Sequence, residues 1–232
     1  MKALVIENIQ ETHDVKCLRI KPDSIFPFKP GQFIMVSHKA VKDGTPVEVK
    51  RPYSIASSPL NHNYIELAFD IKEFGLVSPY LYNLKENDAV EISGPNGFFT
   101  FDDSIKDELI LIGAGTGIAP LIGISRYITE KKLSNKITLI YSCKTKKDII
   151  YHEEIKRIKK HHNNFDYHIT LTQEEWDGLS GRINSNLIKK LISDFNNKIF
   201  YLCGPPKMVI EISKELQELG VLKDRIKLEG YE

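Results

Sequence analysis

The sequence lacks three features that would each mark a particular class of protein. Its three cysteines, Cys17, Cys143 and Cys203, are scattered and show no Cys-x-x-Cys spacing, which excludes a disulfide framework and an iron–sulfur cluster held by four cysteines of this chain. No apolar run approaches the roughly 20 residues of a membrane span. The start reaches Glu7 too soon for a secretory signal, so we expect a cytoplasmic protein.

Neither sign of charge is in excess. Thirty-two basic residues face thirty-one acidic ones, so bulk charge does not favour nucleic-acid binding. The seven histidines show no metal-site spacing, and the pair at 161–162 lies in a basic run typical of a solvated helix end. We therefore predict no metal site. With 232 residues, 41% of them hydrophobic, the chain can form one large or two small domains, each with a core.

The N-terminal part of the chain has the pattern of β-structure. Short runs of alternating apolar residues lie at 3–9, 15–20, 32–38, 64–71 and 89–93. Turn residues such as Pro-Gly, Asp-Gly and Gly-Pro separate them. Spacing of this kind predicts an antiparallel barrel or sandwich, with one short helix at 78–84.

The pattern changes after Phe101. A polar stretch at 102–107 is predicted to be a linker. Continuous apolar runs follow at 109–112, 137–141, 167–171 and 199–202, and they alternate with helix candidates at 118–132, 148–162, 184–193 and 206–219. This alternation predicts buried parallel strands in a doubly wound α/β domain. The chain is therefore predicted to have two domains, residues 1–103 and 104–232.

The first motif is the run RPYSIASSP at residues 51–59, which has strand-like character and ends at a turn proline. In a strand, Arg51 and Tyr53 share one face and Ser54 takes the other. If the strand bends, the guanidinium, the ring and the hydroxyl can converge on a phosphate, a flat heterocycle and a ring nitrogen of one ligand. The alternative is an edge strand with an exposed arginine and a half-buried tyrosine.

A glycine-rich segment, Gly-Ala-Gly-Thr-Gly at 113–117, joins a buried strand to a helix that has Pro120 in its first turn. Glycines let the backbone approach a pyrophosphate, and the helix N-terminus supplies amides. The spacing is not the Gly-x-Gly-x-x-Gly of the standard dinucleotide fingerprint. Its place at the first strand of the α/β domain favours a nucleotide site over an ordinary tight turn.

Two further motifs each allow two interpretations. Residues 203–208, Cys-Gly-Pro-Pro-Lys-Met, follow a parallel strand at its carboxyl end, where open α/β sheets bind ligands. Alternatively they form a turn and a helix start, with Cys203 as a small buried residue. Residues 75–78, Gly-Leu-Val-Ser, can hold a phosphate through their amides and the Ser78 hydroxyl. Alternatively Ser78 is the N-cap of the short helix.

Taken in order along the chain, these four motifs resemble those of the ferredoxin–NADP reductase family: Arg-x-Tyr-Ser, Gly-x-x-Ser, the glycine-rich turn and Cys-Gly-Pro-x-x-Met. The resemblance extends from Pro-Gly-Gln-Phe at 30–33 to the C-terminal residues 228–232. It implies an FAD-binding β-barrel at 1–103 followed by an NAD(P)-binding α/β domain at 104–232.

The resemblance also implies roles for single residues. Arg51 would bind the flavin pyrophosphate, Tyr53 would stack on the isoalloxazine and Ser54 would approach its N5. Ser54, Cys203 and Glu229 are predicted near the reacting atoms, as tuning groups and not as nucleophiles. The predicted cofactor-binding residues are Arg51, Pro52, Tyr53, Ser54, Gly75, Leu76, Val77, Ser78, Gly115, Thr116, Gly117, Lys144, Arg182, Cys203, Gly204, Pro205, Met208 and Tyr231.

The chain departs from the family pattern at two places. Many relatives carry a basic residue on the strand before Gly-x-x-Ser, where this chain has Asp70 or the nearby Lys72. NADPH-preferring members often have Ser-Arg after the third strand of the nucleotide domain, where this chain has Thr-Gln at 172–173. That difference favours NADH or mixed use, although Lys144 and Arg182 can still reach a 2′-phosphate. The terminal Tyr231 is either the aromatic that guards the nicotinamide pocket or an exposed tail.

The implied activity is hydride transfer between NAD(P)H and bound FAD, with a separate acceptor such as ferredoxin, flavodoxin, an oxygenase component or a partner subunit. One alternative is the electron-transfer subunit of a larger complex, as in dihydroorotate dehydrogenases, which usually append a cysteine cluster that is absent here. Another is a free-flavin reductase, against which the motif at 75–78 argues because it favours a retained FAD. A nucleotide-binding module without activity fits the paired motifs least.

Overall fold

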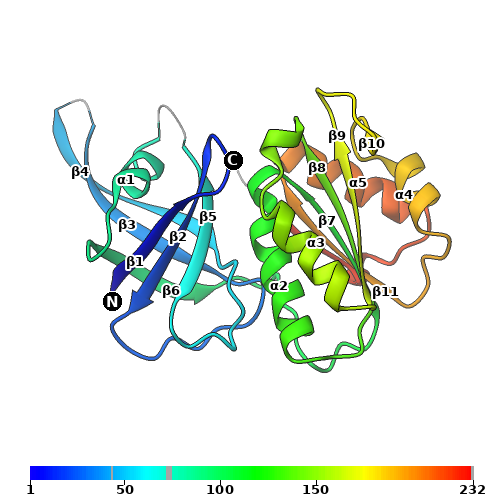
Figure 1. The fold of residues 1–232 in the computed structure, drawn as a ribbon, viewed down its shortest axis with the longest axis horizontal. Coiled ribbons are helices and arrows are strands. Elements are labelled where there is room, and N and C mark those ends of the chain that lie inside the picture. The colour runs from blue at the N-terminus through cyan, green and yellow to red at the C-terminus, as the bar shows by residue number, and fades with distance from the viewer. Residues whose placement is uncertain (43, 72–74, 231–232) are drawn as a thin grey trace. The chain divides into compact units, whose positions relative to one another are not determined.

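The computed structural model describes residues 1–42, 44–71 and 75–230. These residues divide into two compact units, each with its own sheet (Figure 1). The first unit comprises Met1–Asp102 and Ile122–Tyr127, and the second comprises Asp103–Leu121 and Ile128–Glu232. Among the described residues, no helix is both long and apolar enough to cross a membrane.

The first unit is built on six antiparallel strands in the order β4-β3-β6-β1-β2-β5. Its elements are β1 (Lys2–Gln10), β2 (Val15–Pro22), β3 (Phe33–Lys42), β4 (Thr45–Ser54), β5 (Ile65–Asp70), α1 (Ser78–Asn83) and β6 (Ala89–Asn96). Ile55, the residue after β4, forms an isolated antiparallel bridge with Leu67 of β5. Because β4 and β5 stand at the two ends of the strand order, this bridge closes the sheet into a barrel. The predicted antiparallel barrel is confirmed.

Alternation along the strands places the barrel core. Strand β3 buries Ile34 and Val36, and β2 buries Leu18 and Ile20, while residues between them are partly exposed. Because successive side chains of a strand point to opposite faces, such a pattern fills one face with apolar groups. Helix α1 adds Leu81 to the same core.

The second unit contains six parallel strands in the order β10-β9-β8-β7-β11-β12. Its strands are β7 (Glu108–Ala114), β8 (Ile137–Cys143), β9 (Phe165–Leu171), β10 (Leu179–Ser180), β11 (Lys198–Gly204) and β12 (Ile226–Gly230). Its longer helices are α2 (Ile118–Glu130), α3 (His152–His161), α4 (Ser185–Leu191) and α5 (Pro206–Glu218), and short 3₁₀ helices lie at Gly115–Gly117, Lys146–Asp148 and Lys223–Arg225.

Helices cover both faces of the parallel sheet. Figure 1 shows α2 and α3 on one face and α4 and α5 on the other. Ile110 and Ile112 of β7 pack in one cluster with Val209 and Ile212 of α5. Since both faces are buried, the strands are continuously apolar and do not alternate, as in β7. The predicted doubly wound parallel domain is confirmed.

Several element boundaries differ from the prediction. The sequence predicted no strands at β10 and β12, and it predicted strand character in β4 only from Arg51 onward, whereas β4 begins at Thr45. Helix α3 begins at His152 and not at 148, because Lys146–Asp148 forms a 3₁₀ turn closed by a Thr145–Asp148 capping box. The predicted linker at 102–107 is tied into the second unit, where Asn135 Nδ2 donates to the carbonyls of Ile105 and Asp107, both at 3.0 Å.

Candidate functional site

Strand β4 presents the Arg-Pro-Tyr-Ser run at one side of the barrel. Arg51 lies opposite Val36 on β3, and Tyr53 lies opposite Ile34. Since Val36 and Ile34 are core residues, the register places Arg51 and Tyr53 on the same face of the sheet as the barrel core. The Arg51 side chain is nevertheless exposed, and its Nη1 donates to the Lys50 carbonyl at 2.9 Å. Pro52 is exposed, Tyr53 is half-buried and Ser54 is buried. The strand therefore carries a gradient from an exposed cation to a buried hydroxyl.

The Tyr53 ring is held from the inside of the barrel. It meets Phe69 edge to face, with centroids 6.0 Å apart and planes at 79°. Burial raises the pKa of the Tyr53 phenol, the Asp70 carboxylate raises it further, and Arg51 opposes them. The ring is therefore neutral across the physiological range. A half-buried, fixed, neutral aromatic ring is suited to stacking on a flat heterocycle.

The loop at 75–78 leads into the short helix α1. Gly75 and Leu76 are half-buried, whereas Val77 and Ser78 are buried. The hypothesis that Ser78 caps this helix is wrong: Val77 holds the N-cap position, no side chain caps the helix, and Ser78 is already helical. Tyr80, in the first turn of α1, stacks on His38 of β3 with ring centroids 4.0 Å apart, a contact that no sequence motif indicated.

In the second unit, the parallel strands place all their carboxyl ends at one edge of the sheet. The chain runs outward from β7 through β8, β9 and β10, and then returns to β11 on the other side of β7. The order therefore reverses between β7 and β11, which is where open α/β sheets bind ligands. The glycine turn Gly115–Gly117 follows β7, and Cys203 and Gly204 end β11. Both sequence motifs thus lie at this reversal.

The two motifs are in direct contact. A Cβ atom on Gly117 would lie 2.4 Å from the Cys203 carbonyl oxygen and 2.8 Å from the Gly204 Cα. Gly204 has φ of +152°, and its own Cβ would meet the Met208 Cε at 2.9 Å and the Ala114 nitrogen at 3.2 Å. Only glycines allow the two turns to approach this closely.

The outer side of the glycine turn is open, in contrast to its inner side. Gly115 has φ of +54°, and a Cβ there would meet no atom within 4 Å. Its carbonyl accepts a hydrogen bond of 2.9 Å from the hydroxyl of Tyr141, which is fully buried in β8. Thr116 is half-buried beside it. The Tyr141 hydroxyl therefore holds the turn from the side of the sheet, while the outer surface of the turn remains accessible to a ligand.

Residues after β11 and on β12 complete this part of the site. Cys203 is fully buried and lies opposite Glu229, which is half-buried on β12. Pro205 is exposed at the N-cap of α5, and Met208 is half-buried in its first turn. Tyr231 and Lys72, named in the sequence predictions, lie outside the described residues.

The two cations predicted near a 2′-phosphate lie at the same sheet edge. Lys144 follows β8 and is exposed, and its carbonyl accepts from the Gln173 N–H at 2.9 Å. Arg182 is exposed and follows Gly181, whose N–H donates to the Leu171 carbonyl at 2.8 Å. An acidic residue comes between them in the chain: the Glu174 carboxylate accepts from the Lys146 N–H at 2.7 Å. The edge thus carries charges of both signs.

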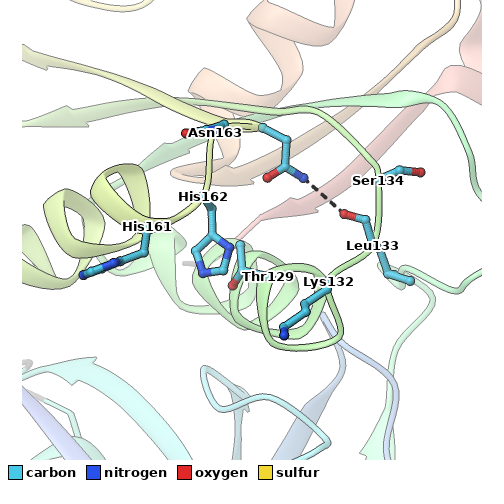
Figure 2. A pocket seen from close by; sticks show the side chains of 8 residues that line it. Thr129, Lys132, Leu133, Ser134, His161, His162 and Asn163 are labelled. Carbon is cyan, nitrogen blue, oxygen red and sulfur yellow. Dashed lines mark hydrogen bonds between the residues drawn. The ribbon is translucent and has the colours of Figure 1, made fainter.

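A hollow of about 350 Å³ lies elsewhere in the second unit. Figure 2 shows His162 pointing toward Thr129 there, and a dashed line marks the hydrogen bond from Asn164 to the Leu133 carbonyl. The hollow lies where α2 and α3 end, and helix C-termini disfavour anions. It is also next to the starts of β8 and β9, away from the carboxyl ends. It is therefore not the nucleotide site.

The described residues fit a flavin and a dinucleotide. The first unit offers a fixed half-buried ring on Tyr53 with an exposed guanidinium on Arg51. The second offers an open, left-handed glycine at 115 beside the N-terminus of a helix, the arrangement that binds phosphates through backbone amides. Such a barrel followed by a doubly wound domain defines a class of oxidoreductases that pair flavin binding with nucleotide binding.

Comparison with known proteins agrees with this class. The family described as oxidoreductase FAD-binding domain matches residues 2–101, and the oxidoreductase NAD-binding domain matches residues 111–214. The glycine betaine monooxygenase reductase subunit of Pseudomonas aeruginosa is 30% identical over 233 residues, which cover 97% of this chain and 63% of that protein. The chain thus spans less than two thirds of the length of this relative.

Solved structures show the same fold. The FAD/NAD-binding domain of a nitric oxide dioxygenase from Vibrio cholerae superposes with a TM-score of 0.89 at 25% identity, covering 99% of this chain and 98% of that one. A ferredoxin NADP⁺ reductase from Neisseria gonorrhoeae, with bound FAD and NADP, gives 0.85 at 20% identity, covering 99% and 98%, and shows the fold alone. The chain belongs to the ferredoxin–NADP reductase family, with an FAD-binding and an NAD-binding domain.

Proposed function

We propose that the protein is an NAD(P)H-dependent flavoprotein reductase that transfers hydride between NAD(P)H and bound FAD and exchanges electrons with a separate acceptor. The observation that carries this proposal is the contact of Gly117 with Cys203 and Gly204 at the strand-order reversal, in a chain that also carries the Arg-Pro-Tyr-Ser strand. In this proposal residues 1–103 form the FAD domain and 104–232 the NAD(P) domain. We place the protein in the cytoplasm, where thiols stay reduced, because its three cysteines are free.

The residues of the first unit are proposed to bind and orient the flavin. Arg51 is exposed and supplies a planar cation for the pyrophosphate, with Pro52 stiffening the strand beside it. Tyr53 stacks on the ring system, and Ser54 approaches its N5. The amides of 75–78 hold the pyrophosphate, a role that favours FAD over FMN. When bound, FAD supplies the group that accepts a hydride and releases electrons.

The residues of the second unit are proposed to bind the nicotinamide nucleotide. Gly115, Thr116 and Gly117 receive its pyrophosphate on their open outer side. Cys203, Gly204, Pro205 and Met208 place the nicotinamide ring, and Glu229, opposite Cys203 in the β11–β12 pair, tunes the surroundings of the reacting atoms. Tyr231 is proposed to guard the nicotinamide pocket.

Nucleotide preference is proposed to favour NADH or mixed use. A 2′-phosphate bound by Lys144 or Arg182 would also lie at the sheet edge that carries Glu174, whose carboxylate accepts from the Lys146 N–H. Like charges disfavour one another at close range, so a doubly charged phosphate gains little there. Lys144 and Arg182 remain the residues to which a bound 2′-phosphate would be assigned.

The acceptor is proposed to be a separate protein, such as ferredoxin, flavodoxin or an oxygenase component. The name of the Pseudomonas relative, a glycine betaine monooxygenase reductase subunit, supports an oxygenase component. An acceptor in a partner subunit is the alternative form of this proposal.

An anaerobic titration tests the proposed function. The purified protein is loaded with FAD, and its visible spectrum is followed during stepwise addition of NADH and, in a parallel sample, of NADPH. We expect bleaching of the flavin band at one equivalent of NADH and at a higher concentration of NADPH. Protein that remains colourless after incubation with FAD would refute the proposal. Bleaching of free FAD without retention would instead identify a free-flavin reductase.

A further inference from the structure

The segment that follows the proposed flavin residues is buried and tied to a single acidic residue. Residues 55–58 are each at most 2% exposed, so their backbone groups need partners inside the protein. The Ala56 N–H donates to the Glu66 carbonyl at 2.7 Å. The Glu66 N–H in turn donates to the Ser57 Oγ at 3.0 Å. The backbone of Glu66 thus holds the segment along one side.

The side chains of Glu66 and Arg126 hold the other side. Arg126 belongs to the part of helix α2 that packs in the first unit, and its Nη1 donates to the Ala56 carbonyl at 2.8 Å and to the Glu66 carboxylate at 2.7 Å. Because one nitrogen serves both acceptors, a movement of either acceptor disturbs the other. Gly123, one turn earlier, touches the same segment: a Cβ there would lie 2.7 Å from the Ile55 oxygen.

A second arginine balances the buried carboxylate. Arg19 Nε donates to the other Glu66 oxygen at 2.8 Å, and Arg19 Nη1 donates to Glu7 at 2.5 Å. The Glu66 side chain is 2% exposed, against 49% for Glu7. Burial by itself would raise the pKa of Glu66, but Arg126 and Arg19 outweigh it and hold that pKa below its usual value. The network therefore stays charged at neutral pH.

We propose that Glu66 and Arg126 are positioning residues, which fix the backbone on both sides of Ala56 and through it the side chains of Tyr53 and Ser54. This inference rests on the proposed function, which assigns those two side chains to the flavin. A buried ion pair is weak evidence for stability, since apolar residues of similar volume often stabilise a fold as well. The hydrogen bond from Arg126 to the Ala56 carbonyl has a geometric consequence that an apolar pair cannot replace.

The first test needs no flavin. Hydrogen exchange is measured by mass spectrometry over residues 51–58 of the unliganded full-length protein, for the parent, Glu66→Gln, Arg126→Gln and Arg126→Lys. The matched control is Glu7→Gln, which removes an ion pair to Arg19 and leaves the Ala56 contacts intact. We expect exchange in this segment to be about tenfold or more faster in Glu66→Gln and Arg126→Gln, and parental in the control. Parental exchange in both Gln variants would overturn the proposal.

The second test measures the consequence for the flavin. In the FAD-loaded fraction of each variant, we expect flavin reduction by NADH to slow by about tenfold or more in stopped flow, since small misplacements of reacting groups have large effects. Arg126→Lys should recover most of the rate, because an ammonium can also donate to both acceptors. Loaded Gln variants that react at the parental rate would overturn the positioning role.

The two tests separate this inference from the proposed function. If the parent binds no FAD, the proposed function fails, and the exchange measurement still decides whether Glu66 and Arg126 fix the segment. If Glu66→Gln does not fold, the comparison of Arg126→Gln with Arg126→Lys decides the question, because both retain the carboxylate. A variant that only lowers the melting temperature, with parental exchange and parental rate, contradicts the inference.

Discussion

Arg51 lies at the exposed end of its motif: Arg51 and Pro52 are exposed, Tyr53 is half-buried and Ser54 is buried. An exposed cation beside a fixed aromatic ring can bind an anion without first breaking an ion pair to any acidic residue within 1–42, 44–71 or 75–230. We therefore expect Arg51 to contribute to ligand binding and not to the stability of the fold.

We predict that Arg51→Ala weakens FAD binding by about 10- to 100-fold, which corresponds to about 1.5–3 kcal/mol for a lost charged hydrogen bond. Fluorescence titration of apoprotein with FAD measures the effect. The matched control is Lys50→Ala, one residue earlier, where the ammonium pairs with Glu48 at 3.4 Å and the side chain points to the opposite face. Equal FAD affinity in parent and Arg51→Ala would contradict the assignment.

Cys203 is fully buried at the end of β11, next to the glycine turn. We predict that Cys203→Ser retains FAD but slows hydride transfer by about tenfold, because a changed group beside the nicotinamide alters the approach of the reacting atoms. Stopped-flow reduction by NADH checks this. Cys17→Ser, a buried cysteine of strand β2 in the barrel, should leave the rate unchanged. An unchanged rate in Cys203→Ser would speak against its placement.

Glu66 makes the free energy of unfolding of the protein depend on pH. A carboxyl whose pKa is lowered in the folded state from its usual value of 4.5 contributes stability above that value and loses it as the pH falls through the folded pKa. We predict that Glu66→Gln lowers the free energy of unfolding at pH 7 by about 3 kcal/mol, and that the difference from the parent shrinks below pH 4.5. Urea unfolding of both proteins at pH 7 and pH 4 measures it, and a constant difference would refute it.

At the scale of elements, the glycine turn after β7 has two sides with opposite requirements. Its inner side must be small because β11 ends against it, and its outer side must be open because a ligand is proposed there. Gly117 meets the first requirement and Gly115 the second.

We predict different failures for the two glycines. Gly117→Ala places a Cβ 2.4 Å from the Cys203 carbonyl oxygen, so it should displace β11 and lower the melting temperature. Gly115→Ala should cost about 1 kcal/mol of stability and raise the KM for NADH several-fold. Gly220→Ala is the control, since it has the same left-handed backbone, φ +89°, and equally open surroundings. A KM effect in Gly220→Ala as large as in Gly115→Ala would contradict the assignment.

At the scale of the whole molecule, the first unit is not a continuous piece of chain. It takes Ile122–Tyr127 from the middle of helix α2, and this segment supplies Gly123 and Arg126 to the barrel. A fragment cut at the predicted domain boundary therefore lacks one of the two arginines of Glu66.

We predict that a fragment of residues 1–103 is less stable than the same unit in the full chain, and that Glu66→Gln destabilises the fragment less than it destabilises the full chain, because Arg126 is absent. Far-ultraviolet circular dichroism during urea unfolding, for both lengths with and without the substitution, measures the effect. An equal effect of Glu66→Gln at both lengths would show that Arg126 contributes nothing.

Local features of the sequence were enough to predict the two folds. Period-two alternation in the N-terminal part and continuous apolar runs in the C-terminal part each follow from how a strand is buried. The glycine turn and the Cys-Gly-Pro turn were predicted at strand ends because glycine and proline act on their own backbone. Strands β10 and β12 escaped prediction because they are short or partly exposed.

Which distant groups meet depends on how the elements pack, and no stretch of sequence showed it. Gly117 packs on Cys203, and Arg126 joins Glu66 and Ala56, through strand order and helix docking that no local pattern encodes. The same holds for the N-cap of α1, where the entry of the chain places Val77 and not Ser78 at the cap. Most elements and their motifs could be predicted from the sequence, since these depend on neighbouring residues. Packing between elements determined the site, because contacts across a sheet depend on register and topology.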